Sequence, residues 1–445
     1  MPDDLELVRL PRADDTSLVR TETHSGLYVR GREDAARVLI CKQKPKLFAA
    51  IQLGGKWGFV DSDGHFAVEP VHHGVLPFSC GLAAFSASPL PFARADFGRA
   101  QTKEIGDADT GQFGYLNLDG DVAVDPIFRL VRTFSEDLAG VNIDGKWGFI
   151  NKRGSIAIEP RYAAVEDFKG GIAKVYLRRD SFFGECGFID TSGRFVIEPR
   201  FDNCGDFSEG LASAGIERGV GYIDRTGVFA IAPQFQGASY FQNGIAQIKL
   251  NGKPSIIDRS GRVLYQFGKP GAWAHNGFID GVARINGTSE HYDSYYVDLR
   301  LRSILHDPSL QAVDRFSEGL GEVRKKVESK HFGMFIDVHG YVDTFGKVKI
   351  EPQFRSASLF KNGRACVAPR VKNDDPRGLN GYTYGFVDEH GTMVIEPRFK
   401  WASDFHNGMA FVQDNGQKRM GYIDTTGKTI IPCQFDEARD FHPVD

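Results

Sequence analysis

Short apolar runs alternate with turn-forming residues along most of the chain, and the same order of runs returns many times. In the clearest copy, an apolar run at 187–189 precedes Asp-x-x-Gly, a second at 195–197 precedes Glu-Pro, and a third at 211–214 follows Phe-x-x-Gly. Runs this short, rich in β-branched and aromatic residues and bounded by Gly, Pro and Asp, predict β-strands. Self-similarity at a nearly fixed period indicates a repeat architecture.

The copies align on a glycine that is followed by an aromatic residue. The tightest spacing is 34 residues, from Gly114 to Gly148, and two worn copies lie near Ser255 and Tyr295, which gives about ten units. The aligned glycines are Gly58, Gly114, Gly148, Gly187, Gly221, Gly340, Gly385 and Gly421.

The Asp-x-x-Gly step predicts a hairpin loop between the first two runs. Asp or Asn at the first position accepts a hydrogen bond from the backbone two residues on, and the glycine takes the left-handed conformation that closes a type I turn with a bulge. The flanking runs are therefore expected to pair as antiparallel strands. The proline that ends the second run, such as Pro199, lacks a donor, so we expect this strand to stop there.

A Phe-x-x-Gly step, such as Phe207 to Gly210, leads into a third apolar run. A unit of three small strands cannot bury its own apolar face, so the copies must stack and share a core. The predicted fold is all-β: a tandem array of about ten hairpin or three-strand repeats that forms an elongated solenoid or superhelix. The alternative is a closed, β-propeller-like arrangement.

Two copies carry a fuller motif, Gly-Lys-Trp-Gly-Phe followed by Val-Asp at 55–61 and by Ile-Asn at 145–151. With the Glu-Pro and Phe-x-x-Gly steps, this resembles the WG-repeat family, also called KWG repeats, over residues 50–445. The resemblance implies an all-β repeat array of a kind common in bacterial proteins, and it brings no catalytic residue. We expect residues 1–47 to be an atypical N-terminal cap and 48–445 to be the array, with worn copies at about 250–340.

Composition narrows the functional classes. The net charge of −4, from 54 basic and 58 acidic residues, argues against a dedicated nucleic-acid binder. No apolar run reaches about 18 residues, and the first residues are acidic where a signal peptide needs a basic segment. The expectation is a cytoplasmic protein without a membrane segment.

The residues that could bind metal, form disulfides or catalyse a reaction show no clustered motif along the sequence. Six cysteines show no Cys-x-x-Cys pair, so neither a disulfide framework nor a zinc site is expected, and Cys186 and Cys366 are interpreted as small core residues. The turn carboxylates are occupied by their own turns, which argues against calcium. Common catalytic signatures are absent, so we expect no enzyme and no cofactor. The glutamates before proline are expected to form a solvated or salt-bridged row with Arg161, Arg200 and Arg398.

Extra residues follow the third run in several copies, at 86–110, 177–184, 324–339, 369–383 and 413–420. Because they share one slot of the unit, they should project from one edge, where repeat proteins commonly bind partners. Basic residues gather in this slot and predict a rim for a protein partner, possibly an acidic one. The candidate partner-binding residues are Arg178, Arg179, Arg324, Lys325, Lys326, Arg370, Lys372 and Arg377.

Three functional hypotheses follow. The leading one is a non-catalytic protein-interaction scaffold, because the sequence offers a long surface and no reaction chemistry. A narrower version is an immunity-type protein that neutralises a partner toxin. The third is an enzyme or carbohydrate-binding module with a pocket on the loop edge.

Overall fold

The computed structural model describes residues 5–9, 26–29, 37–41, 46–89, 112–179, 184–217, 219–267, 273–286, 294–298, 300, 302–328, 335–370, 382–416 and 418–444. Every regular element among them is a β-strand, which confirms the all-β prediction. The chain forms two compact units, Met1–Lys46 with Asp445, and Leu47–Val444. The first unit holds one antiparallel sheet in the order β1-β3-β2, built from β1 (Leu5–Arg9), β2 (Gly26–Val29) and β3 (Arg37–Cys41).

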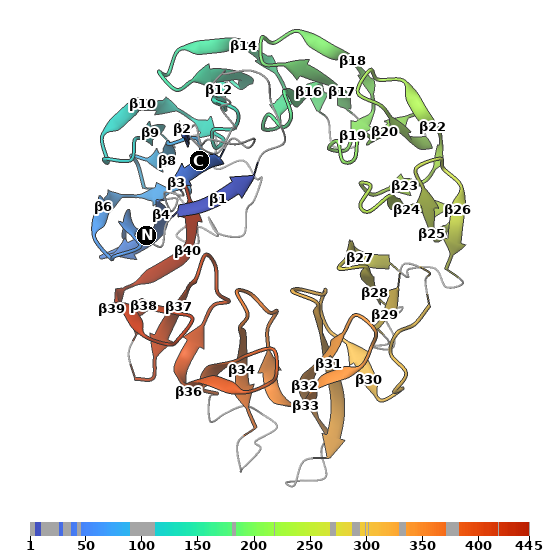
Figure 1. Cartoon of the computed structure of the whole chain (residues 1–445). Helices are drawn as coiled ribbons and strands as arrows, with labels where there is room; N and C mark the ends of the chain where they lie inside the picture. Colours follow the sequence, from blue (N-terminus) through green and yellow to red (C-terminus); the bar gives the residue numbers. More distant parts are fainter. Residues whose placement is uncertain are drawn as a thin grey trace. The chain divides into compact units, whose positions relative to one another are not determined.

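The second unit is a succession of small antiparallel sheets, most of them four-stranded (Figure 1). The sheet that contains the start of the array has the order β40-β4-β5-β6, from β4 (Leu47–Leu53), β5 (Lys56–Asp61), β6 (Phe66–His72) and β40 (Glu437–Pro443). The next sheets comprise β7 (Gly74–Val75), β8 (Ala83–Ser86), β9 (Phe113–Leu116) and β10 (Val122–Phe128); β11 (Leu130–Val131), β12 (Leu138–Ile143), β13 (Lys146–Asn151) and β14 (Ile156–Tyr162); and β15 (Ala164–Val165), β16 (Ile172–Arg179), β17 (Gly184–Asp190) and β18 (Phe195–Phe201).

The later sheets continue the series. They comprise β19 (Asn203–Cys204), β20 (Ala212–Ile216), β21 (Gly219–Ile223) and β22 (Phe229–Phe235); β23 (Gly237–Ala238), β24 (Ile245–Leu250), β25 (Lys253–Asp258) and β26 (Val263–Gln266); and β27 (Trp273–Ile279), β28 (Val282–Asn286) and β29 (Tyr295–Asp298). A ten-stranded sheet then runs through β30 (Leu310–Ala312), β31 (Leu320–Glu328), β32 (Phe335–Asp343), β33 (Val348–Ala357), β34 (Ala365–Pro369), β35 (Tyr384–Val387), β36 (Met393–Ala402), β37 (Met409–Asp414), β38 (Met420–Asp424) and β39 (Thr429–Phe435).

Each four-stranded sheet is offset from the sequence motif. In the sheet β15-β16-β17-β18, the first two strands come from the copy that begins at Gly148 and the last two from the copy that begins at Gly187. This differs from the three-strand unit expected from the sequence. The third run of one copy pairs with the first run of the next, so hydrogen bonding itself ties consecutive copies together.

The hairpin loops follow the predicted chemistry. In the loop after β17, Asp190 Oδ1 accepts the amides of Ser192 and Arg194 at 2.9 and 3.1 Å. Gly193 has φ 82° and its amide donates to the Asp190 carbonyl, as a type I turn with a bulge requires. The worn copy near Tyr295 keeps the same loop at Asp298, which accepts the amides of Arg300 and Arg302.

The strand that carries Glu-Pro does not stop at the proline, contrary to the sequence prediction. In β18, Ile197 pairs with Phe188 and Phe201 pairs with Cys186, with an irregular register between them that contains Pro199. The missing donor is accommodated by this bulge at the outer strand of the sheet. The bulge passes over Gly187, where an added Cβ would lie 2.5 Å from the Ile197 carbonyl oxygen.

Among the described residues, aromatic pairs lie in the core of nine copies. The ring after the aligned glycine, or the ring in its place, packs with centroids 4.5–5.0 Å apart against the Phe of Phe-x-x-Gly, or against Phe134 and Phe441 where the glycine is absent. The pairs are Phe59–Phe78, Tyr115–Phe134, Phe149–Phe168, Phe188–Phe207, Tyr222–Phe241, Tyr296–Phe316, Tyr341–Phe360, Phe386–Phe405 and Tyr422–Phe441. Where the ring is Tyr115, its hydroxyl donates to the Arg132 carbonyl at 2.7 Å, so the buried polar atom is satisfied.

Contacts between neighbouring sheets also repeat. The turn glycine of one sheet lies against an aliphatic residue of the preceding outer strand, as Gly193 does against Ile158. Arg161 donates to the Gly193 carbonyl at 2.8 Å. Arg200 donates to the Gly227 carbonyl and Arg398 to the Gly427 carbonyl, both at 2.7 Å. Among the described residues these arginines form no ion pair with the glutamates before proline, so the salt-bridged alternative is wrong: they bond turn carbonyls and lie over the neighbouring rings of Tyr162, Phe201 and Phe399. The glutamates themselves are exposed, as the solvated alternative predicted.

The two ends of the array meet in one sheet. The apolar run at 48–53 resembles the third strand of a copy that lacks its first half, and β40 supplies the missing neighbour by pairing antiparallel with β4. The Asp436 amide donates to the Gln52 carbonyl at 2.8 Å. Gly64 lies against Ile431 of the last copy, which is the same contact that other copies make with their predecessors. Contacts between successive sheets thus return to the first sheet.

Candidate binding cleft

The Phe-x-x-Gly steps are tight turns that link one copy to the next. The two central residues have positive φ, 50° at Glu209 and 81° at Gly210, which is the type I′ geometry of a two-residue hairpin. The serine after Phe donates its hydroxyl to the carbonyl of the next copy's Phe, as Ser208 does to Phe241 at 2.6 Å. The following Glu209 accepts the Gly244 amide at 2.9 Å. We call this pair of bonds the turn latch.

In the part of the chain that the structure describes, the complete turn latch recurs in three copies, and other turns keep part of it: Asp280 and Asn362 each accept an amide of the next turn, and Asn407 donates to the Phe441 carbonyl. The serine bond is also present at Ser79, Ser135 and Ser317, and the carboxylate bond at Glu136 and Glu318. At the junction between the 168–171 and 207–210 turns, Lys169 and Gly170 occupy the two places. Among the described residues, no side chain of the first turn bonds the backbone of the second.

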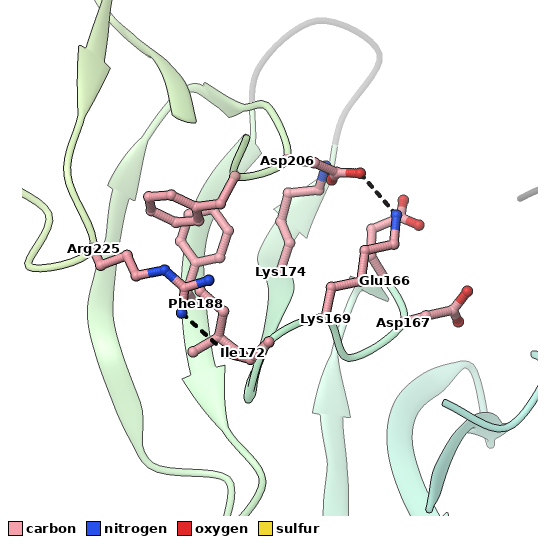
Figure 2. A pocket seen from close by; sticks show the side chains of 10 residues that line it. Glu166, Asp167, Lys169, Ile172, Lys174, Phe188, Asp206 and Arg225 are labelled. Atoms are coloured by element: carbon pink, nitrogen blue, oxygen red, sulfur yellow. Dashed lines mark hydrogen bonds and ion pairs between the residues drawn. The ribbon is translucent and has the colours of Figure 1, made fainter. Parts of the chain in front are cut away.

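A cleft of about 400 Å³ opens where the latch is missing, between the sheets β15–β18 and β19–β22 (Figure 2). Phe207 is partly exposed there, whereas the equivalent Phe168 and Phe241 are buried. The cleft is lined by Glu166, Asp167, Lys169, Gly170, Ile172, Lys174, Phe188, Asp206, Phe207 and Arg225. It combines an aromatic and aliphatic wall with charged groups of both signs.

The three carboxylates of the cleft are neutralised within the protein. Arg132, whose side chain is only 8% exposed, bonds Glu166 and Asp167 at 2.6 Å each. Asp206 pairs with Lys174 at 3.0 Å and with Lys169 at 3.1 Å. Burial alone would raise the pKa of Asp206, but the charge and hydrogen bond of Lys174 and those of Lys169 outweigh it and lower the pKa. This carboxylate is therefore ionised at neutral pH.

Of the described residues that line the cleft, Arg225 is the one cation that takes no part in these ion pairs. It projects from the loop after β21 and donates to the Gly170 carbonyl at 3.0 Å, while its guanidinium lies 5.7 Å from the centre of the Phe207 ring. Among the described residues, no carboxylate forms an ion pair with it. Counting Arg132, four cations thus face three carboxylates around the cleft.

The lining of the cleft offers charged and apolar contacts. It contains no Ser, Cys or His that could act as a nucleophile or as a base near neutral pH. Elsewhere, Asp61, Asp63 and His65 lie within 4.8 Å of one another at an exposed hairpin loop. Asp61 Oδ1 already accepts the amides of Asp63 and His65, so these residues are explained by the loop itself.

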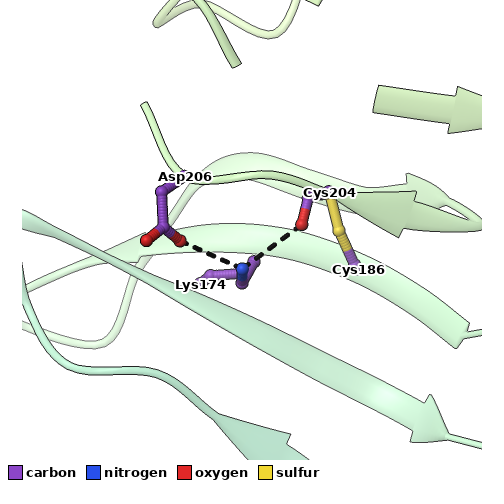
Figure 3. The surroundings of a disulfide bond; sticks show 4 residues. All are labelled: Lys174, Cys186, Cys204 and Asp206. Atoms are coloured by element: carbon purple, nitrogen blue, oxygen red, sulfur yellow. Dashed lines mark hydrogen bonds and ion pairs between the residues drawn. A yellow bond between two sulfur atoms is a disulfide. The ribbon is translucent and has the colours of Figure 1, made fainter. Parts of the chain in front are cut away.

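A disulfide lies beside the cleft and corrects an expectation from the sequence. Cys186 of β17 and Cys204 of β19 are joined, with Cα atoms 6.2 Å apart, which lies within the range that disulfides span (Figure 3). Lys174 donates to the Cys204 carbonyl at 3.2 Å as well as to Asp206. Both cysteines are buried, as expected for Cys186. The spacing along the chain gave no sign that they would meet, because they belong to neighbouring sheets.

The basic residues singled out from the sequence lie apart from the cleft. Arg178 is exposed near the end of β16, and Arg179 ends that strand. Arg324 and Lys325 lie within β31 and pair with Asp337 and Asp307 at 3.5 and 3.8 Å, and Lys326 is exposed. The segment 324–339, expected as an insertion, largely extends the β31–β32 hairpin. Arg370 is exposed, and Lys372 and Arg377 lie outside the described residues.

Sequence reasoning missed the cleft, although one signal was present. Three copies read Phe-Ser-Glu at the turn, whereas the copy at 168 reads Phe-Lys-Gly. This departure could have been noticed, but its meaning depends on the turn latch, which only the structure shows.

None of the described residues forms a helix long and apolar enough to cross a membrane.

Solved structures resemble the fold at low sequence identity. A eukaryotic initiation factor is 11% identical with a TM-score of 0.45, over 76% of this chain and 97% of its own. BamB from Moraxella catarrhalis is 9% identical with a TM-score of 0.31, over 70% and 93%, and apo AztD from Citrobacter koseri is 11% identical with a TM-score of 0.32, over 90% and 97%. No curated protein matches the sequence.

The repeats match a known protein family. The family described as "WG containing repeat" matches residues 57–86, 113–147, 147–178, 187–215, 221–253, 340–368, 384–417 and 420–442. These eight segments cover more than half of the chain and coincide with the copies aligned on the Gly-aromatic pair. The chain belongs to the WG-repeat family.

Proposed function

We propose that this protein is a non-catalytic scaffold that binds a protein partner. The observation that supports it most is how the repeated polar groups are used. The turn aspartates accept amides of their own loops, the turn serines and glutamates bond the next copy, and the arginines after Glu-Pro bond turn carbonyls. These groups hold the array together and leave its surface to recognition.

The exposed basic residues remain part of this proposal. Arg178, Lys326 and Arg370 are exposed, so they can form a rim that attracts an acidic partner. Arg324 and Lys325 contribute less to that attraction, because Asp337 and Asp307 already offset their charges.

Affinity capture from the native host, followed by binding of the purified partner, tests the proposal. We expect a protein that binds the full chain saturably with a fixed stoichiometry in calorimetry. Turnover of a small molecule by the purified chain, or failure of any captured protein to bind after purification, would contradict a scaffold role.

A further inference from the structure

We propose that the cleft between β15–β18 and β19–β22 binds a carboxylate-bearing peptide segment of the partner, with Arg225 as its principal ionic contact. The inference rests on the proposed scaffold function and names the site and the chemistry that it recognises. It is independent of the basic rim, because none of the rim residues lines the cleft.

Charge is the first argument. The cleft's carboxylates are already matched by Arg132, Lys174 and Lys169, whereas Arg225 bonds only a backbone carbonyl and faces a ring. A guanidinium presents a planar set of donors that fits a carboxylate, and a hydrogen bond between two charged groups is stronger than one between neutral groups. The group that a ligand can still neutralise is therefore positive, and the ligand should be anionic.

The size and the wall of the cleft are the second argument. About 400 Å³ lies at the lower end of ligand pockets and suits one or two side chains rather than a long segment. Phe207 and Ile172 are partly exposed in the cleft and offer an apolar surface beside Arg225. An acidic residue next to an aromatic or aliphatic one would use both features together.

The broken turn latch is the third argument. The next junction has the same arginine contact, because Arg259 donates to the Glu209 carbonyl at 2.8 Å as Arg225 does to the Gly170 carbonyl. There the turn latch is intact, and Phe241 is fully buried. Where Ser and Glu are replaced but Asp280 or Asn362 keeps a bond to the next turn, Phe316 and Phe405 stay buried. At Lys169 and Gly170 no described side chain of the turn bonds the next turn's backbone, and Phe207 is partly exposed. The cleft is thus a local departure from the repeat, which is typical of a recognition site.

The test uses two fluorescent eight-residue peptides, one alternating Glu and Phe and the other with Gln in place of every Glu. Binding to the full chain is followed by fluorescence anisotropy at low salt. We expect the Glu peptide to bind saturably and the Gln peptide to bind at least about tenfold more weakly, since the charge-assisted contact is lost. Equal affinity for both peptides, or no saturable binding of the Glu peptide, would overturn the inference.

Variants of two equivalent arginines locate the site. Arg225→Gln should weaken binding of the Glu peptide by about tenfold, and Arg225→Lys should restore part of it. The matched control is Arg259→Gln, which removes the same kind of backbone bond one copy later and should leave the affinity unchanged within about twofold. If the two Gln variants weaken binding equally, the cleft is not the site.

A second variant closes the cleft by restoring the turn latch. Lys169→Ser with Gly170→Glu copies the residues of the other turns, where Glu136, Glu209 and Glu318 adopt the same positive φ of 50–53°. An added side chain at Gly170 meets only the flexible end of Arg225, which can move aside. This variant should keep or raise the melting temperature and lose binding of the Glu peptide. Retained binding in a variant with an intact latch would exclude the cleft.

The captured partner separates failure of this inference from failure of the scaffold proposal. A partner that binds the wild-type chain and the latch-restored chain equally well leaves the scaffold standing and rejects the cleft as its site. If the partner binds the wild-type chain but not the latch-restored chain, both proposals are supported. Absence of a binding partner removes the scaffold, while the peptide experiment still decides whether the cleft recognises carboxylates.

Discussion

The aligned glycines are required by the strand that crosses them. An added Cβ at Gly187 would lie 2.5 Å from the Ile197 carbonyl oxygen and 2.7 Å from the Pro199 nitrogen, and the atoms in the way are backbone. The neighbouring strand cannot withdraw without losing its bulge. Other residues replace the tryptophan of the family motif in most copies of this chain, but the glycine is kept because the neighbouring backbone leaves no room for a side chain.

We predict that Gly187→Ala destabilises its neighbourhood by about 1–3 kcal/mol, the usual cost of overpacking. The control is Gly215→Ala, where the nearest atom to the added methyl group is 3.7 Å away. Thermal melting with hydrogen exchange should show lost protection around 184–201 for the first variant only. Similar behaviour of the two variants would mean that the bulge adapts.

The two neighbouring phenylalanines of the Phe-x-x-Gly turns should differ in their importance for stability. Phe241 is fully buried, so Phe241→Ala should cost about 3–5 kcal/mol. Phe207 is partly exposed at the cleft, so Phe207→Ala should cost less and act mainly on binding. Chemical denaturation of both variants measures the difference, and an equal loss would show that Phe207 is buried in solution.

At the scale of elements, the hairpin loops make stability depend on pH. Hydrogen bonds from Ser192 lower the pKa of Asp190 to about 2, and its loop amides act in the same direction. Hydrogen bonds from Thr226 and Ser260 likewise lower the pKa of Asp224 and Asp258. Because the folded pKa lies below the unfolded one, the stabilisation is present above about pH 4 and is lost as pH falls toward 2.

We predict that the melting temperature falls steeply between pH 4 and pH 2, as measured by calorimetry. A triple variant, Asp190→Asn with Asp224→Asn and Asp258→Asn, should be less sensitive to acid. The side-chain oxygen of Asn can still accept the backbone amides of the loop, but Asn does not titrate. Asn117 and Asn151 already occupy this position in two copies. Unchanged acid sensitivity of the variant would place the titrating groups elsewhere.

The Cys186–Cys204 bond ties two sheets together across an 18-residue separation. Closing a loop of this size restricts the unfolded chain and is worth about 2–4 kcal/mol. We predict that peptide mapping without reductant recovers the joined pair and that reduction or Cys204→Ser lowers the melting temperature. Cys80→Ser is the control, since Cys80 is a free thiol. Two titratable thiols at 186 and 204 in protein purified without reductant would refute the bond.

Local structure could be predicted from the sequence, but the meeting of distant segments could not. The loop at Asp190 and the pairing of its flanking strands follow from turn chemistry within a few residues. The bulge at Pro199, the pairing of β40 with β4 and the cleft beside Phe207 depend on which segments become neighbours. Hydrophobic periodicity carries no information about such partners, so the offset between motif and sheet also escaped prediction.

At the scale of the whole array, the pairing of β4 with β40 makes the contacts between sheets a cycle. An open array would leave the edge of β4 uncovered and could lengthen by separation of its ends. We predict that solution scattering of residues 46–445 gives a compact particle. An extended particle would favour the solenoid that the sequence also allows.

Removal of residues 437–445 tests the same pairing. The edge of β4 would then present free backbone donors and acceptors, which invite pairing with another chain. We predict a lower melting temperature and concentration-dependent association in light scattering. A synthetic peptide of residues 436–445 should reverse both effects, and a monomeric truncated chain with an unchanged melting temperature would contradict the role of β40.

The same sheet contains strands separated by nearly the whole array, from β4 at Leu47–Leu53 to β40 at Glu437–Pro443. During synthesis β4 leaves the ribosome first and must wait for almost four hundred further residues before its neighbour emerges. At about 5–20 residues per second, that interval lasts tens of seconds. The earliest part of the array to be made is therefore the last to be completed, and the nascent chain must keep one strand edge from pairing wrongly throughout its own translation.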